Sequence, residues 1–282
     1  MRSSTGRERR FTNNLSSSRS TTNELNRQFR QGLLRVSVHG SENSLGRAAA
    51  SAAAFFIRES IQRRGKARLL FSAANSQLEM IASLAKQQDI EWQAVEVLHV
   101  DEYVGIPISH PQSFAGWVKR NLVLVVNPGK VNYIAGDAAD IEAECQRYAL
   151  LLTQEPIDVS FLGIGENGHI GFNDPHAADF SDPKVVKLVT LDERCREQQV
   201  REGHWREFSD VPTVGFAVTC PALINAAHIV CCVPGTHKAE AVRNTLEGPI
   251  APSCPASCLR THQDAELYLD INSASLLTRS KT

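Results

Sequence analysis

The sequence lacks several features that would place it in other classes of protein. Its apolar runs fall short of the roughly 20 residues that cross a membrane, and no charged segment followed by an apolar one opens the chain as a secretory signal would. Neither sign of charge is in excess, since 30 basic and 31 acidic residues leave a net charge of -1. We therefore expect neither a membrane nor nucleic acid as the partner, and any anion site must be local.

Paired cysteines are also missing. The chain has 7 cysteines, an odd number, and no C-x-x-C pair, which argues against a disulfide framework and against a metal site with that spacing. A metal half-site made of Cys254 and Cys258 is the alternative. Otherwise we expect reduced thiols, no metal, and a cytoplasmic protein.

Apolar residues are scarce over residues 1–31, which hold arginines on a background of Ser, Thr and Asn. Such a stretch cannot bury enough apolar surface to order itself, so we predict a disordered arm over residues 1–31. An organelle transit peptide is the alternative, although the stretch lacks an amphipathic pattern. A single domain would then occupy residues 32–282.

From residue 33 onward, segments with strand and helix spacing alternate. We predict strands near residues 34–38, 69–71, 95–100, 131–134, 157–164, 185–189, 214–218, 229–233 and 267–269, and helices over 44–64, 77–88, 112–126, 141–153 and 237–246. Ser76 and Glu79 have the spacing of a capping box, which marks the start of the second helix. Repeated strand-then-helix units without a linker predict an α/β domain with a mainly parallel sheet and helices on both faces.

The segment over residues 157–175 changes from a buried strand into a Gly-rich polar turn. Its glycines let the backbone take positive φ and approach a ligand closely. Polar side chains lie among and after these glycines: Glu166, Asn167, His169, Asn173 and Asp174. Because open α/β sheets place their sites after the carboxyl ends of strands, we expect a functional site here, with a solvated turn as the alternative.

Two helix starts after predicted strands carry groups that suit an anion. Ser72, Asn75 and Ser76 offer hydroxyls, an amide and backbone N–H groups, although the loop lacks the ending of a Walker motif. In the segment 235–238, Lys238 lies in the first turn of a predicted helix, where the helix dipole disfavours a positive charge. An anion bound between the lysine and the helix N-terminus would make this position favourable. Ordinary helix caps at the surface are the alternative at both places.

Two adjacent carboxylates, Asp101 and Glu102, follow the strand near residues 95–100. Neighbouring residues of a strand point to opposite faces, so only one of them can enter a site. We choose Asp101, which the alternation places on the same side as His99. A carboxylate in a partly dry cleft can serve as a general base, whereas a solvated acidic loop is the alternative.

Together these motifs resemble the glucosamine-6-phosphate deaminase family, which is related to the 6-phosphogluconolactonases. DEYVGIP over residues 101–107 and HPQSF over 110–114 look like the family's DEYVGLP and HPESY, and GIGENGHIGFNDP over 163–175 resembles its GxGxDGHIAFNEP. Residues 211–218 and 234–241 are similar to a strand and a G-x-x-K-A segment of the family. The likeness runs in order over about residues 33–270.

The resemblance implies a single Rossmann-like domain and a reaction without metal or cofactor on a small-molecule sugar phosphate. Glucosamine 6-phosphate, or its galacto epimer, would become a ketose 6-phosphate plus ammonia, and a homo-oligomer is left open. His169 would open the sugar ring, and Asp101 would move the C2 proton to C1, while Asn167 and Asp174 would support the histidine. The implied phosphate site consists of Ser72, Asn75, Ser76 and Lys238.

The sequence departs from the family pattern in three places. Asn167 stands where the family usually has Asp, so it can orient His169 but cannot stabilise an imidazolium by charge. Asp174 is one methylene shorter than the usual Glu. The family's phosphate arginine falls on Gln199, and the sequence leaves open which neighbour, if any, replaces it: Arg194, Arg196 or Arg201.

Two other functions compete with a deaminase. The related lactonases share the sheet and the histidine motif, but they typically have Asp-Glu-Arg where this chain has Asp101-Glu102-Tyr103. A non-catalytic sugar-phosphate sensor is suggested by Asn167 and by the altered phosphate loop. Against the sensor, Asp101 and His169 are both present.

Overall fold

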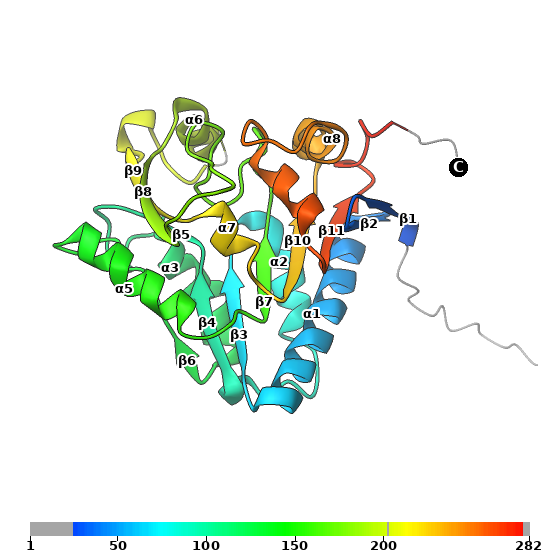
Figure 1. Ribbon diagram of the computed structural model, residues 1–282, viewed down its shortest axis with the longest axis horizontal. Helices are drawn as coiled ribbons and strands as arrows, with labels where there is room; N and C mark the ends of the chain where they lie inside the picture. Colours follow the sequence, from blue (N-terminus) through cyan, green and yellow to red (C-terminus); the bar gives the residue numbers. More distant parts are fainter. Residues whose placement is uncertain (1–24, 202, 279–282) are drawn as a thin grey trace, which may run out of the picture.

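The structure, a computed structural model, describes residues 25–201 and 203–278 (Figure 1). Its main sheet has eight strands in the order β1-β2-β11-β10-β7-β3-β4-β6, and every neighbouring pair is parallel except β1 and β2. These strands are β1 Leu25–Gln31, β2 Leu34–His39, β3 Ala67–Phe71, β4 Val95–His99, β6 Lys130–Val131, β7 Val159–Leu162, β10 His228–Val233 and β11 Ala265–Asp270. The predicted α/β fold with a mainly parallel sheet is confirmed.

Helices cover both faces of this sheet, as the strand-helix alternation predicted. They are α1 Glu42–Arg64, α2 Leu78–Leu84, α3 Phe114–Val118, α4 Leu124–Val126, α5 Ile141–Thr153, α6 Glu193–Arg201, α7 Cys220–Leu223 and α8 Ala239–Glu247. Apolar residues of α1, α2, α3 and α4 pack on one face, and those of α5, α7 and α8 pack on the other.

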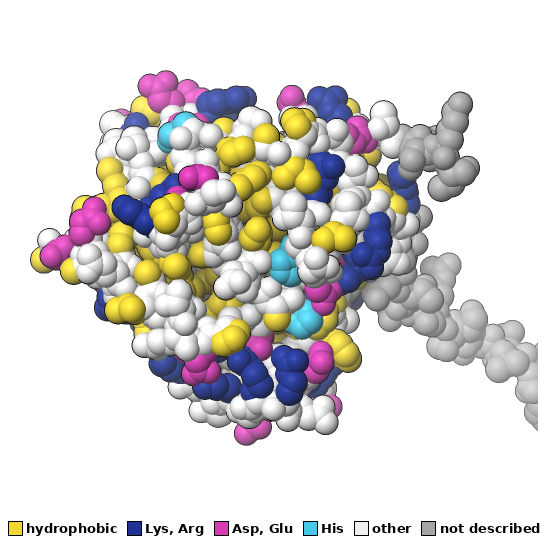
Figure 2. Space-filling model, in the orientation of Figure 1, with side chains coloured by type: hydrophobic (Ala, Val, Ile, Leu, Met, Phe, Trp, Pro, Cys, Tyr) yellow, Lys and Arg dark blue, Asp and Glu magenta, His cyan; other side chains and the backbone are white. Residues whose placement is uncertain are grey.

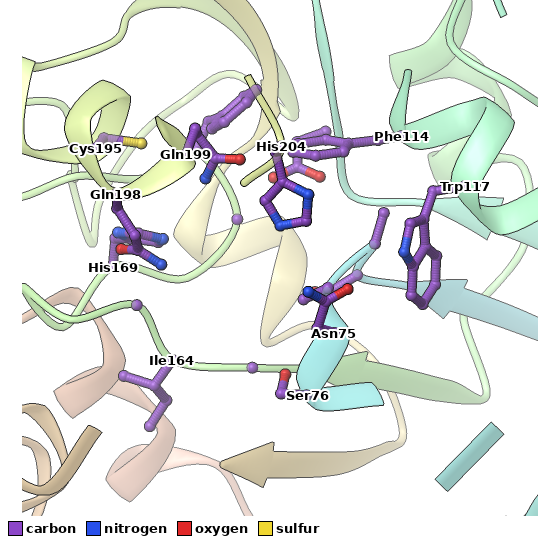
Figure 3. Close-up of a pocket in the computed structure, with 18 of the residues that line it drawn as sticks. Asn75, Ser76, Phe114, Trp117, Ile164, His169, Cys195, Gln198, Gln199 and His204 are labelled. Atoms are coloured by element: carbon purple, nitrogen blue, oxygen red, sulfur yellow. The ribbon is translucent and has the colours of Figure 1, made fainter. Parts of the chain in front are cut away.

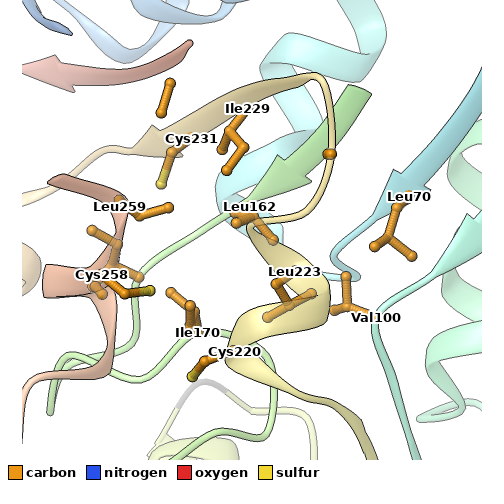
Figure 4. Packing of buried hydrophobic residues seen from close by; sticks show 14 of the residues in the cluster. Leu70, Val100, Leu162, Ile170, Cys220, Leu223, Ile229, Cys231, Cys258 and Leu259 are labelled. Atoms are coloured by element: carbon orange, nitrogen blue, oxygen red, sulfur yellow. The ribbon is translucent and has the colours of Figure 1, made fainter. Parts of the chain in front are cut away.

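Adjacent residues of the central strands alternate between the two faces. Leu70, Leu162 and Cys231 belong to the cluster under α5, α7 and α8 (Figure 4), whereas Phe71 and Phe161 belong to the cluster under α1 and α2. The two phenylalanine rings stack with centroids 4.1 Å apart. A sheet buried on both faces holds the carboxyl ends of its strands in fixed positions.

A second, smaller sheet differs from the prediction. β5 Asp101–Tyr103, β9 Val214–Val218 and β8 Val186–Thr190 form an antiparallel sheet in the order β5-β9-β8, beyond one end of the main sheet (Figure 1). Val100 joins the two sheets, because its N–H donates to Phe71 O and its own carbonyl accepts from Val218 N. Asp101 therefore begins a strand, where a loop was predicted.

The predicted disorder of residues 1–31 is wrong for residues 25–31, which form β1. β1 pairs with β2 as an antiparallel hairpin whose turn contains Gly32 at φ 61°, and Phe29 packs against the main core. Backbone pairing to an existing strand orders a polar segment that could not fold alone. The rest of the predicted arm, residues 1–24, lies outside the described residues.

The predicted capping box of Ser76 and Glu79 does not form. A 3₁₀ turn over Asn75–Gln77 precedes α2 without a side-chain cap, and Glu79 instead accepts a hydrogen bond from Asn43 at 3.1 Å. The Ser76 hydroxyl accepts from Gln77 Nε2 at 3.1 Å and lines a cavity. α2 ends at Leu84, short of the predicted end at residue 88.

The other helix predictions differ mainly at their ends. The helix predicted over 112–126 begins at Phe114 and contains a π-helical turn over Lys119–Val123, and the helix predicted over 237–246 begins with a 3₁₀ turn over Thr236–Lys238. No helix in the described ranges is long and apolar enough to cross a membrane.

Candidate active site

A cavity of about 360 Å³ lies where the carboxyl ends of β3, β7 and β10 meet the small sheet and α6 (Figure 3). Its lining residues come from seven places: the first residue of α1, the loop after β3, β5, α3 with the segment before it, the Gly-rich loop after β7, α6 with the segment that follows it, and the loop after β10. The parallel sheet thus brings together segments that are far apart in the sequence.

The predicted site residues gather at this cavity. Six of them line it: Ser72, Asn75, Ser76, Asp101, His169 and Lys238. The other two, Asn167 and Asp174, contact the ring of His169. The sequence-based placement of these side chains therefore agrees with the structure, while their roles stay predictions.

His169 is held through one ring nitrogen. Its Nδ1 lies 2.8 Å from Asn167 Oδ1 and 3.3 Å from Asp174 Oδ1. The backbone N–H of His169 also donates to Asn167 Oδ1, and Asn167 Nδ2 donates to Asp174 Oδ1, so the amide orientation follows from its neighbours. Because both neighbours of Nδ1 are acceptors, Nδ1 carries a proton and donates to them, and Nε2 is the ring nitrogen outside these contacts.

Asp174 supplies the negative charge behind His169. Its side chain is 1% exposed, and burial alone would raise its pKa, but the hydrogen bond and charge of His169 and the hydrogen bond from Asn167 lower the pKa overall. Asp174 is therefore ionised at neutral pH. The amide of Asn167 orients both partners without adding a charge.

Asp101 has the properties of a buried base. Burial and then the charge of Glu102 raise the pKa of Asp101 well above its usual value. The Gly-rich loop passes close to this carboxylate, since a Cβ atom on Gly171 would lie 3.4 Å from Asp101 Oδ2. A carboxylate with a raised pKa accepts a proton more strongly than an exposed one.

His99 fixes the backbone of Asp101. The N–H of Ile134 donates to His99 Nε2 at 2.9 Å, so Nδ1 must carry the proton that binds Asp101 O at 2.9 Å. Burial lowers the pKa of His99 to about 4, although the hydrogen bond with Asp101 opposes that shift. His99 is therefore neutral and acts as a positioning residue.

Glu102 points away from the cavity, as the strand alternation predicted. It accepts hydrogen bonds from the Ser113 hydroxyl and from the backbone N–H groups of Tyr103, Phe114 and Ala115. Burial raises the pKa of Glu102, and these hydrogen bonds offset part of that effect. Glu102 thus anchors the start of α3 beside the cavity.

The end of the cavity near β3 and β10 is rich in donors. Ser72 Oγ is buried without a partner among the described residues. Ser76 Oγ lies close to the backbone of Gly163, since a Cβ atom on that glycine would be 3.0 Å from it. Lys238 is buried and lines the same cavity, as does the exposed ring of His237. Hydroxyls, amides and cations at strand ends form a surface that suits an anion.

None of the arginines proposed as phosphate ligands lines the cavity in the described structure. Arg196 donates to Phe208 O and Val211 O, and Arg201 pairs with Glu166 at 2.7 Å. Gln199, which occupies the family's arginine position, does line it.

Sequence reasoning missed an aromatic wall and a histidine on the segment after α6. His204 and Trp205 line the cavity, and Trp205 stacks on His110 with centroids 5.1 Å apart and meets Tyr103 edge-on at 5.6 Å. Figure 3 shows His204 near Asn75, Phe114 and Trp117. The only signal for this wall in the sequence is the His-Trp pair itself.

Cys195 is a further residue that no sequence pattern indicated. It lines the cavity from α6, and its ligand atom lies within 4.8 Å of those of His169 and Asp174. Burial and the nearby carboxylate of Asp174 raise the pKa of its thiol. In the described ranges these three residues are the group of three or more His, Cys and acidic side chains close enough to share an ion, and Cys254 and Cys258 do not belong to it.

A carboxylate, a supported histidine and a donor-rich end of one cavity lie at the carboxyl edge of this mainly parallel sheet, an arrangement typical of α/β enzymes that use acid–base chemistry. Residues 40–269 match the family described as Glucosamine-6-phosphate isomerases/6-phosphogluconolactonase, and the chain belongs to this family. The resemblance read from the motifs is confirmed.

Two relatives align with most of this chain and with most of their own length. A protein named glucosamine-6-phosphate deaminase from Listeria welshimeri is 36% identical over 238 residues, which are 84% of this chain and 98% of that protein. A protein with the same name from Pseudarthrobacter chlorophenolicus is 31% identical over 249 residues, which are 86% of this chain and 93% of that protein.

Solved structures support the same architecture. A monomeric glucosamine-6-phosphate deaminase superimposes with a TM-score of 0.79 at 29% identity and covers 86% of this chain and 99% of its own. The 6-phosphogluconolactonase of Trypanosoma brucei superimposes with a TM-score of 0.71 at 16% identity, and the match covers 89% of this chain and 100% of that protein. At this identity the match shows a shared fold and no more.

Proposed function

We propose that this protein is an amino sugar 6-phosphate deaminase/isomerase that converts glucosamine 6-phosphate, or its galacto epimer, to a ketose 6-phosphate plus ammonia. The observation that carries this proposal is the presence of Asp101 and His169 on one cavity that has a donor-rich end. The names of the relatives at 31% and 36% identity support the same activity.

His169 would act first, on the closed sugar ring. With Nδ1 held by Asn167 and Asp174, the Nε2 lone pair can take the proton of the C1 hydroxyl and return a proton to the ring oxygen. The charge of Asp174 stabilises the imidazolium formed between these transfers. The product is the open-chain amino aldehyde.

Asp101 would act second, on the open chain. It takes the proton from C2 and returns it to C1, while the C1 carbonyl oxygen gains a proton and the amino nitrogen gives one up, so that the double bond moves from C1 and oxygen to C2 and nitrogen. Water then adds to C2, and ammonia leaves to give the ketose. The raised pKa of Asp101 suits a base that must hold the proton between two carbons.

The phosphate would lie at the donor-rich end of the cavity. Lys238 supplies the charge, and Ser72, Asn75 and Ser76 supply neutral donors. Because Gln199 replaces the family's arginine, we propose that the cavity-lining histidines His204 and His237 donate further hydrogen bonds to the phosphate. They line the cavity where the arginines of α6 do not.

Ammonia release from glucosamine 6-phosphate and galactosamine 6-phosphate, measured beside hydrolysis of 6-phosphogluconolactone, tests this function. We expect ammonia release from one amino sugar and no lactone hydrolysis. Lactone hydrolysis without ammonia would favour the lactonase, and binding without turnover would favour the sensor. Asp101→Asn should lower deamination by about 10²–10⁴-fold and stop exchange of the C2 proton with D₂O.

We also propose a cytoplasmic enzyme that acts without nucleic acid, with a homo-oligomer as an open alternative. The unpaired cysteines and the net charge of -1 support this view. On the face seen in Figure 2, acidic and basic side chains are interspersed with apolar groups.

A further inference from the structure

We propose that the side chain of Glu42 binds the sugar phosphate as a proton donor, so that the protein takes up a proton from solvent when the phosphate binds. Glu42 is the first residue of α1, and it lines the cavity together with the loop after β3 and the turn over residues 235–238. This inference rests on the proposed function for the identity of the ligand, a phosphorylated sugar.

The packing of α1 on α2 places Glu42 at the donor-rich end of the cavity. A Cβ atom on Gly46 would lie 2.8 Å from the backbone carbon of Glu79, so the two helices approach each other more closely than a side chain would allow. Asn43 Nδ2 also donates to Glu79 Oε2 at 3.1 Å, and a capping box fixes the first turn of α1. The start of α1 is therefore held beside the start of α2, which follows the loop after β3.

Asp270 lies at the end of β11 and holds the turn on the other side of Glu42. Its buried Oδ1 accepts from the N–H of Gly235 at 3.1 Å and from that of Ser273 at 2.7 Å. Asp270 is thus occupied by backbone donors. The carboxylate of Glu42, in contrast, has no hydrogen bond or ion pair with the residues that the structure describes, and it is available to a ligand.

The charges at this end of the cavity do not balance a phosphate unless a proton is added. Of the cavity-lining residues that the structure describes, only Lys238 is a lysine or an arginine. A phosphate ester carries close to two negative charges above its second pKa of about 6, and an ionised Glu42 adds another. A proton on Glu42 removes one of these charges and turns a repelling acceptor into a hydrogen-bond donor.

The surroundings of Glu42 already favour its protonated form. Burial raises the pKa of Glu42, and the charges of Glu79 and Asp270 raise it further. The charge of His237 acts in the opposite direction. A bound phosphate raises the pKa again, because it brings more negative charge to the same place. The proton that enters from solvent then lies in an O–H···O hydrogen bond between the carboxyl group and a phosphate oxygen, and no other bond changes.

Calorimetry of the full-length protein with sorbitol 6-phosphate tests the proton uptake. This ligand has no carbonyl group to react, and its phosphate is its only titratable group. Binding heats in buffers of different ionisation enthalpy, at about pH 7.5 where the phosphate carries close to two charges, give the number of protons taken up. We expect uptake by the wild type and a smaller uptake by Glu42→Gln, because an amide donates a hydrogen bond without gaining a proton. Equal uptake by the two proteins would overturn the proposal.

The pH dependence of KM for the amino sugar phosphate gives a second test. KM should rise with pH more steeply in the wild type than in Glu42→Gln, so that the variant has a KM lower by about 2–10-fold at alkaline pH. Glu59→Gln is the matched control, since Glu59 lies on the same helix, is exposed and is outside the cavity lining. Its KM should follow that of the wild type. A KM of Glu42→Gln at or above the wild-type value at every pH would contradict the proposal.

The wild-type protein decides the matter even if Glu42→Gln does not fold. Binding of sorbitol 6-phosphate without proton uptake would overturn the role of Glu42. If the protein releases no ammonia, the proposed function fails, while calorimetry still tests Glu42. If it releases ammonia and binds the phosphate without proton uptake, only the inference about Glu42 fails.

Discussion

The ring of His169 lies directly against Gly165: a Cβ atom on Gly165 would overlap ring atoms Cε1, Nδ1 and Nε2 of His169. The backbone is tight here, because Gly165 N donates to His169 O and Gly168 N donates to Gly165 O, both at 2.9 Å. The glycine is thus required for close approach of the histidine.

Gly165→Ala should displace the imidazole and lower kcat/KM by about 10²-fold or more, because small misplacements of a catalytic group are costly. Kinetics of the single variant and of the variant combined with His169→Gln check this. In the His169→Gln background, Gly165→Ala should cost little more, since the displaced ring is gone. A similar loss in both backgrounds would show that Gly165 acts on something other than His169.

Asp101→Asn should stabilise the protein at neutral pH. Burial and the charge of Glu102 raise the pKa of Asp101, so its contribution to stability is present below the unfolded pKa of about 3.9 and is lost as pH rises through the folded-state pKa. Asparagine resembles the neutral carboxyl at every pH. Calorimetry should show a higher Tm for the variant at neutral pH and a gain that vanishes near pH 4. A lower Tm at neutral pH would contradict this assignment.

Glu102→Gln should shift the acid limb of the kcat/KM profile to lower pH. The charge of Glu102 raises the pKa of Asp101, so its removal lowers that pKa and lets the base ionise at lower pH. The variant should also lose about 1–3 kcal/mol of stability, because an amide cannot accept all the hydrogen bonds at the start of α3. An unmoved limb in a folded variant would mean that another group controls it.

Lys238→Ala should raise KM for the phosphorylated sugar more than it lowers kcat, because a phosphate contact gives mostly uniform binding. Arg201→Ala is the matched control, since Arg201 pairs with Glu166 and lies outside the cavity lining. Its KM should change little. A loss confined to kcat in Lys238→Ala would place the lysine in the chemical step.

Deletion of residues 1–31 should lower Tm, because it removes β1 and exposes the edge of β2. Deletion of residues 1–24 keeps that strand, and we expect from its composition that Tm and turnover change little. Equal Tm values for the two truncated proteins would show that β1 contributes no stability.

Local sequence patterns predicted the parts of the fold that depend on neighbouring residues. Continuous apolar runs located β3 and β10, an apolar-rich segment located β4, and alternating apolar residues located the start of β7. The choice of Asp101 over Glu102 followed because a strand sends successive side chains to opposite faces. Polar residues after strands located His169, Ser72 and Lys238, because parallel strands end at a common edge.

Tertiary structure decided the features that depend on distant partners. The chain leaves the main sheet at Val100 to pair with β9, which made a predicted loop into β5, and pairing with β2 made a strand of residues predicted to be disordered. Ser76 has the spacing of a cap, yet its hydroxyl faces the cavity instead.

The position of α6 across the cavity brings Cys195 to His169 and keeps Arg196 and Arg201 out of the lining. The spacing of residues along the chain does not predict such contacts, because they depend on how α6 packs over the loop after β7, which lies many residues earlier in the sequence. The sequence by itself therefore determined which side chains could do acid–base chemistry, and only the packing decided which of them share one cavity.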